Sequence, residues 1–159
     1  MKARTLAVAL AAAMSFTVVP TVMAAENHAA HEHRAEGRLR LALNEGRKWD
    51  TDEKLRQSMG DIRDVLAAQR SSVFGRSITA AEYRVLAAKI EAKLGYIVAN
   101  CKLDPAADAN LHVVLGELSG AADALKKGPA DKSAEGLDRA VLAVNEYGKH
   151  FDHPGWKAL

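Results

Sequence analysis

Side chains that bind metal ions are concentrated in two parts of this 159-residue chain. It has a single cysteine, Cys101, and six histidines, three near the N-terminus and three in the second half. The histidines are His28, His31, His33, His112, His150 and His153. Thiolate, imidazole and thioether donors together suit copper, particularly Cu(I), and thiolate with imidazole also suits zinc. No pair has the spacing of a strong motif such as C-x-x-C or H-E-x-x-H.

The N-terminal segment has the pattern of a secretory signal. Lys2 and Arg4 precede an uncharged apolar stretch over 6–19, and small residues allow cleavage after Ala24 or Ala25. The apolar stretch is too short to span a bilayer comfortably, and no other segment approaches that length. We therefore expect a signal peptide over residues 1–24, a periplasmic location, and no membrane attachment after cleavage.

The charge balance excludes one class of partner. The chain has 22 basic and 20 acidic residues, but Lys2 and Arg4 belong to the predicted signal, which contains no acid. The mature chain is thus formally neutral, with both signs interspersed. Such a chain has no field that would attract it to nucleic acid, so nucleic-acid binding is not expected.

Residues 25–48 are predicted to form an extended, His-rich arm. The stretch 26–33 is polar and has no helical periodicity, and Leu39, Leu41 and Leu43 then alternate with other residues. Alternation with a period of two is typical of extended chain lying on an apolar surface. The turn expected at 44–46 ends the arm, and helical periodicity begins after Trp49.

Residues 49–159 predict four helices with recognisable start signals. Thr79 and Glu82 form a capping box, Asp104-Pro105 is an N-cap with proline in the first turn, and Gly128-Pro129 is a stop signal. For the first helix, Asp50 and Glu53 have capping-box spacing. The expected helix starts are Asp50 or Thr51, Thr79, Asp104, and Asp131 or Ser133.

Each predicted helix has one apolar seam. The seams are Leu55, Met59, Ile62 and Leu66; Tyr83, Ala87, Ile90, Leu94, Ile97 and Cys101; Leu111, Leu115, Leu118, Ala122 and Leu125; and Leu137, Val141, Val144 and Tyr147. Short connections between helices of similar length favour antiparallel neighbours. The expected fold is therefore all-α, an up-down-up-down four-helix bundle.

This topology brings the candidate metal ligands to one end of the bundle. Cys101 ends the second helix, His112 and Met59 lie at similar depth, and His150 and His153 close the fourth helix. The arm with His28, His31 and His33 enters at the same end. We therefore predict that these eight residues include the ligands of a copper or zinc ion.

Each candidate ligand also has a structural interpretation. Cys101 stands on an apolar seam and is equally suited to fill the core, and a methionine such as Met59 on a seam is more often a core residue than a ligand. His112 follows Asp108 by one turn, and His150 follows Glu146. These carboxylates either orient metal-bound imidazoles or form ordinary helix-surface pairs.

Several short motifs resemble those of a group of small secreted helical proteins of proteobacteria. The motifs are Asn100-Cys101-Lys102-Leu103, Leu111-His112, Tyr147-Gly148-Lys149 and the Asp152-His153-Pro154-Gly155-Trp156 that follows Phe151. The likeness extends through Lys48-Trp49 and covers most of the mature chain. It implies a periplasmic helical protein, and the similar His-rich tract favours metals.

Two other functions compete with metal handling. A b-type haem electron carrier would use Met59 with His112 or His150, since helical bundles hold haem between ligands from different helices. A scaffold bundle that binds a periplasmic protein partner needs no site at all. An enzyme is not expected, because there is no nucleophile elbow, phosphate-binding glycine loop or H-E-x-x-H motif.

Overall fold

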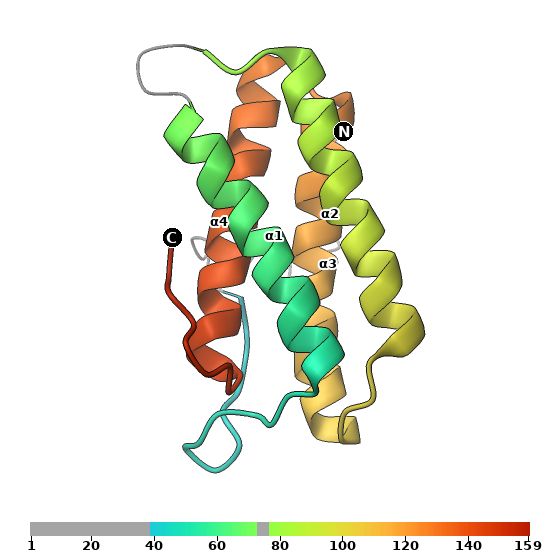
Figure 1. Cartoon of the computed structure of the whole chain (residues 1–159), viewed down its shortest axis with the longest axis vertical. Coiled ribbons are helices and arrows are strands. Elements are labelled where there is room, and N and C mark those ends of the chain that lie inside the picture. Colours follow the sequence, from blue (N-terminus) through green and yellow to red (C-terminus); the bar gives the residue numbers. More distant parts are fainter. Residues whose placement is uncertain (1–38, 73–76) are drawn as a thin grey trace, which may run out of the picture. The chain divides into compact units, whose positions relative to one another are not determined.

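The computed structural model describes residues 39–72 and 77–159, all within one compact unit of 35–159. Four helices pack against each other: α1 (Glu53–Ser72), α2 (Ala80–Asn100), α3 (Pro105–Lys127) and α4 (Ala130–His150) (Figure 1). The described residues contain no β-strand, which confirms the predicted all-α class. The predicted signal peptide and the histidines at 28, 31 and 33 lie outside the described residues.

The start of α1 differs from the prediction. The helix begins at Glu53, and its cap is Asp52, whose Oδ1 accepts a 2.7 Å hydrogen bond from the Leu55 N–H. The predicted start at Asp50 or Thr51 was therefore wrong by two to three residues. Asp50 and Glu53 have the right spacing, but an N-cap must directly precede the first helical residue.

The other helix boundaries are close to the predicted ones. Thr79 and Glu82 form the reciprocal capping box at the start of α2. Asp104 is in the N-cap position of α3, although its side chain makes no capping hydrogen bond. Gly128 ends α3, and α4 begins at Ala130, one residue before the earlier of its two predicted starts.

The predicted seams form the core. The four seam residues of α1 have no exposed surface, and every predicted seam residue of α3 is buried. Two positions differ: Val141 is half-buried, and Cys101 lies just beyond the end of α2. The spacing identified the inner faces correctly because a stripe repeating every three or four residues stays on one side of a helix.

The helices pack in neighbouring pairs, α1 on α2, α2 on α3, α3 on α4, and α4 on α1. α3 and α4 approach each other closely at Gly136, where an added Cβ would lie 2.9 Å from the Ala124 Cβ and 3.0 Å from the Ala121 carbonyl oxygen. Nearby, the buried Ser133 hydroxyl lies 3.3 Å from the Gly128 carbonyl oxygen, which it can satisfy as a donor. None of the helices in 39–72 and 77–159 is both long and apolar enough to cross a bilayer.

The described part of the arm is attached to the bundle. Leu39 and Leu41 pack against the core, whereas Leu43 is exposed. The Ala42 N–H donates to the Asn110 side chain at 2.9 Å, and the Ala42 carbonyl accepts a 2.7 Å hydrogen bond from the Trp49 indole. Two of the three alternating leucines thus lie on the apolar surface of the bundle.

The chain after α4 folds back onto the helix through aromatic contacts. The Tyr147 ring stacks on Phe151, with centroids 5.1 Å apart, and meets the Trp156 ring edge-on at 5.0 Å. The Trp49 N–H donates to the His150 carbonyl at 2.8 Å, which joins the segment before α1 to the end of α4. These contacts seal this end of the bundle.

Close packing of Trp156 on α4 makes a testable prediction at Gly148. A Cβ added there would overlap the Trp156 indole, whereas one added at Gly95, on the exposed face of α2, meets nothing within 4 Å. We expect Gly148→Ala to reduce the free energy of unfolding by about 1–3 kcal/mol, as overpacking does. Urea unfolding followed by tryptophan fluorescence measures the change. The matched Gly95→Ala should instead stabilise by about 0.5–1 kcal/mol; equal effects of the two would show that Trp156 does not pack on Gly148.

Candidate metal site

Cys101 lies where α2 gives way to the connection with α3. Its backbone is extended, with φ −73° and ψ 145°, and its N–H donates to the Ile97 carbonyl at 2.9 Å. The side chain is half-buried and forms no disulfide. As expected from its position on the seam, this residue is partly buried, but it lies at the end of the helix rather than within it.

Asp52 holds the Cys101 segment against the start of α1. While its Oδ1 caps α1, its Oδ2 accepts a 2.7 Å hydrogen bond from the Lys102 N–H, and the Cys101 thiol also donates to the carboxylate. Burial would raise the pKa of Asp52, but these hydrogen bonds, with the charge of Lys54, lower it overall. Asp52 is a residue that the sequence analysis missed, because its second contact is 50 residues away in the chain.

The same contacts determine the state of the thiol. Burial and then the negative charge of Asp52 raise the pKa of Cys101 to about 11. At neutral pH the group is therefore a thiol that donates to a carboxylate. A metal ion bound there must displace this proton, because the thiolate is the ligand form.

Cys101 and His112 line one cavity of about 390 Å³ between the end of α2 and the first turns of α3. Asp108 also lines it, one helical turn before His112. The other lining side chains are mainly apolar: Ile97, Val98, Leu103, Leu111 and Leu115, with Lys102. Two of the predicted ligands, Cys101 and His112, thus line the same cavity.

The orientation of His112 is compatible with metal binding. Its Nδ1 lies 2.9 Å from the Asp108 carbonyl oxygen and 3.4 Å from an Asp108 carboxylate oxygen. If Nδ1 carries the proton, it donates to Asp108 and leaves the Nε2 lone pair available. Imidazoles that bind metals usually donate their other ring N–H to a carbonyl or carboxylate in this way. The side chain is 65% exposed, so Nε2 is accessible.

The other two described histidines, His150 and His153, do not line this cavity. The Nδ1 of His150 lies 2.8 Å from the Glu146 carbonyl oxygen, and the Nδ1 of His153 lies 3.1 Å from the Tyr147 hydroxyl. Burial, together with the charge of Arg56, lowers the pKa of His153. Within residues 39–72 and 77–159, no three His, Cys, Asp or Glu side chains are grouped closely enough to hold a metal ion.

Met59 is part of the hydrophobic core. It has no exposed surface and does not line the cavity of Cys101 and His112. The position agrees with the core interpretation of its seam spacing. The haem pairing of Met59 with His112 or His150 stays a prediction.

Comparison of the chain with protein-family models, with curated proteins and with solved structures gave no match.

Proposed function

We propose that this chain is a periplasmic metal-binding bundle that handles or buffers copper or zinc ions, with Cys101 and His112 as ligands. One observation carries the proposal: a thiol and an imidazole from different elements line the same small cavity. The cleaved signal over 1–24, the up-down-up-down order of the helices and the His-rich arm are parts of this proposal.

The chemistry of the cavity favours a soft or borderline cation. A thiolate with an imidazole suits Cu(I) and zinc better than the hard cations, which prefer oxygen ligands. The carboxylates of Asp52 and Asp108 both act on the Cys101 thiol electrostatically. They disfavour a bare thiolate, but the same negative field favours a cation beside the sulfur. Asp108 can supply a further oxygen ligand if its side chain turns toward the ion.

The remaining predicted ligands have separate roles in this proposal. His28, His31 and His33 form a weaker cluster on the arm, which collects metal ions and passes them to the bundle. His150, the last residue of α4, and His153, just after it, are not ligands of the ion held by Cys101. Removal of residues 26–33 is therefore expected to slow copper uptake without abolishing the bundle site.

Copper titration of the metal-free mature protein tests the assignment of the ligands. We expect Cys101→Ser to weaken Cu(I) binding, measured by competition with a chromogenic chelator, by at least about 100-fold. His112→Ala should weaken it by about 10-fold or more. Even loss of a hydrogen-bond partner of a ligand costs 10–100-fold in metal affinity, so loss of a ligand itself should not cost less.

The matched control is His150→Ala, which removes an imidazole outside the cavity and should leave Cu(I) affinity unchanged. Unchanged affinity in both cavity variants would overturn the proposal. An absorbance spectrum of protein purified from its native compartment separates the alternatives. A Soret band would indicate the haem-binding carrier, and the absence of both haem and metal would favour the scaffold.

A further inference from the structure

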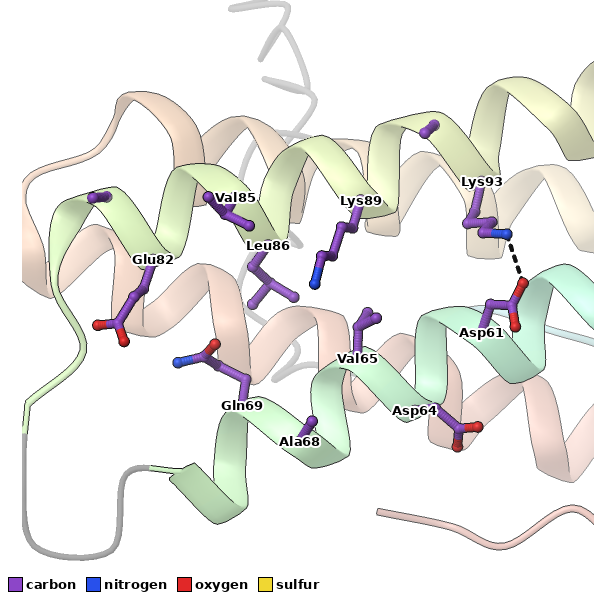
Figure 2. Close-up of a pocket in the computed structure, with 12 residues that line it drawn as sticks. Asp61, Asp64, Val65, Ala68, Gln69, Glu82, Val85, Leu86, Lys89 and Lys93 are labelled. Carbon is purple, nitrogen blue, oxygen red and sulfur yellow. Dashed lines mark hydrogen bonds and ion pairs between the residues drawn. The ribbon is translucent and has the colours of Figure 1, made fainter.

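A second concave surface lies between α1 and α2, away from Cys101 and His112. Its volume is about 910 Å³, and its wall is largely apolar (Figure 2). Val65 and Leu86 form the floor, and Ala68, Ala81 and Ala92 leave space around them. We call this surface the α1–α2 groove.

The groove lies beside the buried seams of the two helices. The seams carry buried residues of one shared core, such as Ile62 and Leu66 on α1 and Ile90 on α2. Beside them, Ala68, Ala81, Val85 and Ala92 line the groove with side chains that are too short to close the space between the helices. Val85, on the α2 side, is 56% exposed. Apolar surface gathered in a concave, open strip is typical of a ligand groove.

The charged side chains that line the groove differ in whether they form ion pairs. Lys93 forms a 2.6 Å ion pair with Asp61, and Asp64 pairs with Arg63. Lys89 extends from α2 across the groove toward α1 (Figure 2). It has no hydrogen bond or ion pair with the residues that the structure describes. Among the described residues, this ammonium group therefore has no partner, and it lies above an apolar floor.

We propose that the α1–α2 groove binds a free fatty acid, with its acyl chain on the floor between Val65 and Leu86 and its carboxylate at Lys89. The charge of Lys89 complements the carboxylate. The volume is within the range of about 300–1,000 Å³ that is usual for small-molecule sites. The stretch of α2 from Glu82 to Lys93 is about 16 Å long at 1.5 Å per residue, which accommodates a medium-length acyl chain.

A partner helix fits this surface less well than an acyl chain. A helix with its side chains is about 10–12 Å wide, and it needs a broad apolar stripe. Here the charged side chains of Asp61, Asp64, Glu82 and Lys93 line both sides of the floor. They leave a narrow apolar strip, which matches a single hydrocarbon chain.

Titration of the metal-free mature protein with fatty acids of eight, ten and twelve carbons tests the proposal. Calorimetry should show affinity rising by about threefold to fourfold with each added methylene, as expected for burial of the chain. Lys89→Gln should reduce affinity for laurate about 10-fold and leave that for the uncharged dodecanol unchanged. Lys132→Gln, which changes a lysine on α4 outside the groove, is the matched control and should have no effect.

A second variant tests the floor independently of charge. Ala92→Trp places a large side chain in the groove from an exposed position on α2, and it should abolish binding of both laurate and dodecanol. Three results would overturn the proposal: no binding at any chain length, equal affinity for laurate in wild type and Lys89→Gln, or binding that Ala92→Trp leaves intact. Because copper is absent throughout, failure here is distinguishable from failure of the proposed metal site.

Discussion

Replacement of Tyr147 by alanine is expected to reduce the free energy of unfolding by about 3–5 kcal/mol, which is the usual cost of deleting a large buried aromatic ring. Tyr147 has no exposed surface and contacts three rings, those of Phe151, His153 and Trp156. Loss of its ring leaves a cavity where the chain after α4 folds back onto the bundle. Urea unfolding monitored by circular dichroism measures the effect.

Two variants separate the parts of this effect. Tyr147→Phe retains the ring but loses the 3.1 Å contact of the hydroxyl with His153 Nδ1, so it should cost only about 0.5–1.5 kcal/mol. Tyr96→Ala removes a ring that is 43% exposed and should change stability by no more than about 0.5 kcal/mol. If Tyr147→Ala were as mild as Tyr96→Ala, the aromatic cluster would not stabilise the fold.

The helical part of the fold could be predicted because its signals are local. Thr79 and Glu82 are three residues apart and satisfy each other, so the start of α2 follows from a short stretch of sequence. The seams follow from the helical repeat in the same way. Asp52 could not be identified, because its role depends on Lys102 and Cys101, which approach it only in the folded chain.

The ends of the helices can be predicted from the sequence to within about one helical turn, but the neighbours of an individual side chain cannot. Cys101 and His112 line one cavity because a short connection joins α2 to α3, with Cys101 at the end of α2 and His112 two turns into α3. His153 does not line this cavity, since the chain turns after α4 and brings this ring against Tyr147 and Trp156. Small residues such as Ala68 gave no signal of the α1–α2 groove, because a groove arises where large side chains are missing.

Asp52→Ala is expected to reduce the free energy of unfolding by about 2–4 kcal/mol. An aspartate N-cap typically contributes about 1 kcal/mol, and a hydrogen bond to a charged group contributes about 1.5–3 kcal/mol. Asp52 makes both kinds of contact, to Leu55 at the start of α1 and to Lys102 after α2. Asp50→Ala is the matched control: Asp50 is exposed and does not cap α1, so its replacement should cost less than about 0.5 kcal/mol.

The effect of Asp52 should also depend on pH in a defined direction. Because its pKa is lower in the folded protein than the ordinary value of 3.8, its carboxylate stabilises the fold above that pH. This contribution is lost as the pH falls through the lower, folded-state pKa. Asp52→Asn should therefore be less stable than wild type at pH 7, and its stability should approach that of wild type in strong acid.

The same variant removes the charge that helps to raise the pKa of Cys101, so native thiol labelling should become several-fold faster. A constant stability difference from pH 7 into strong acid, with unchanged labelling, would show that the carboxylate does not link α1 to Cys101.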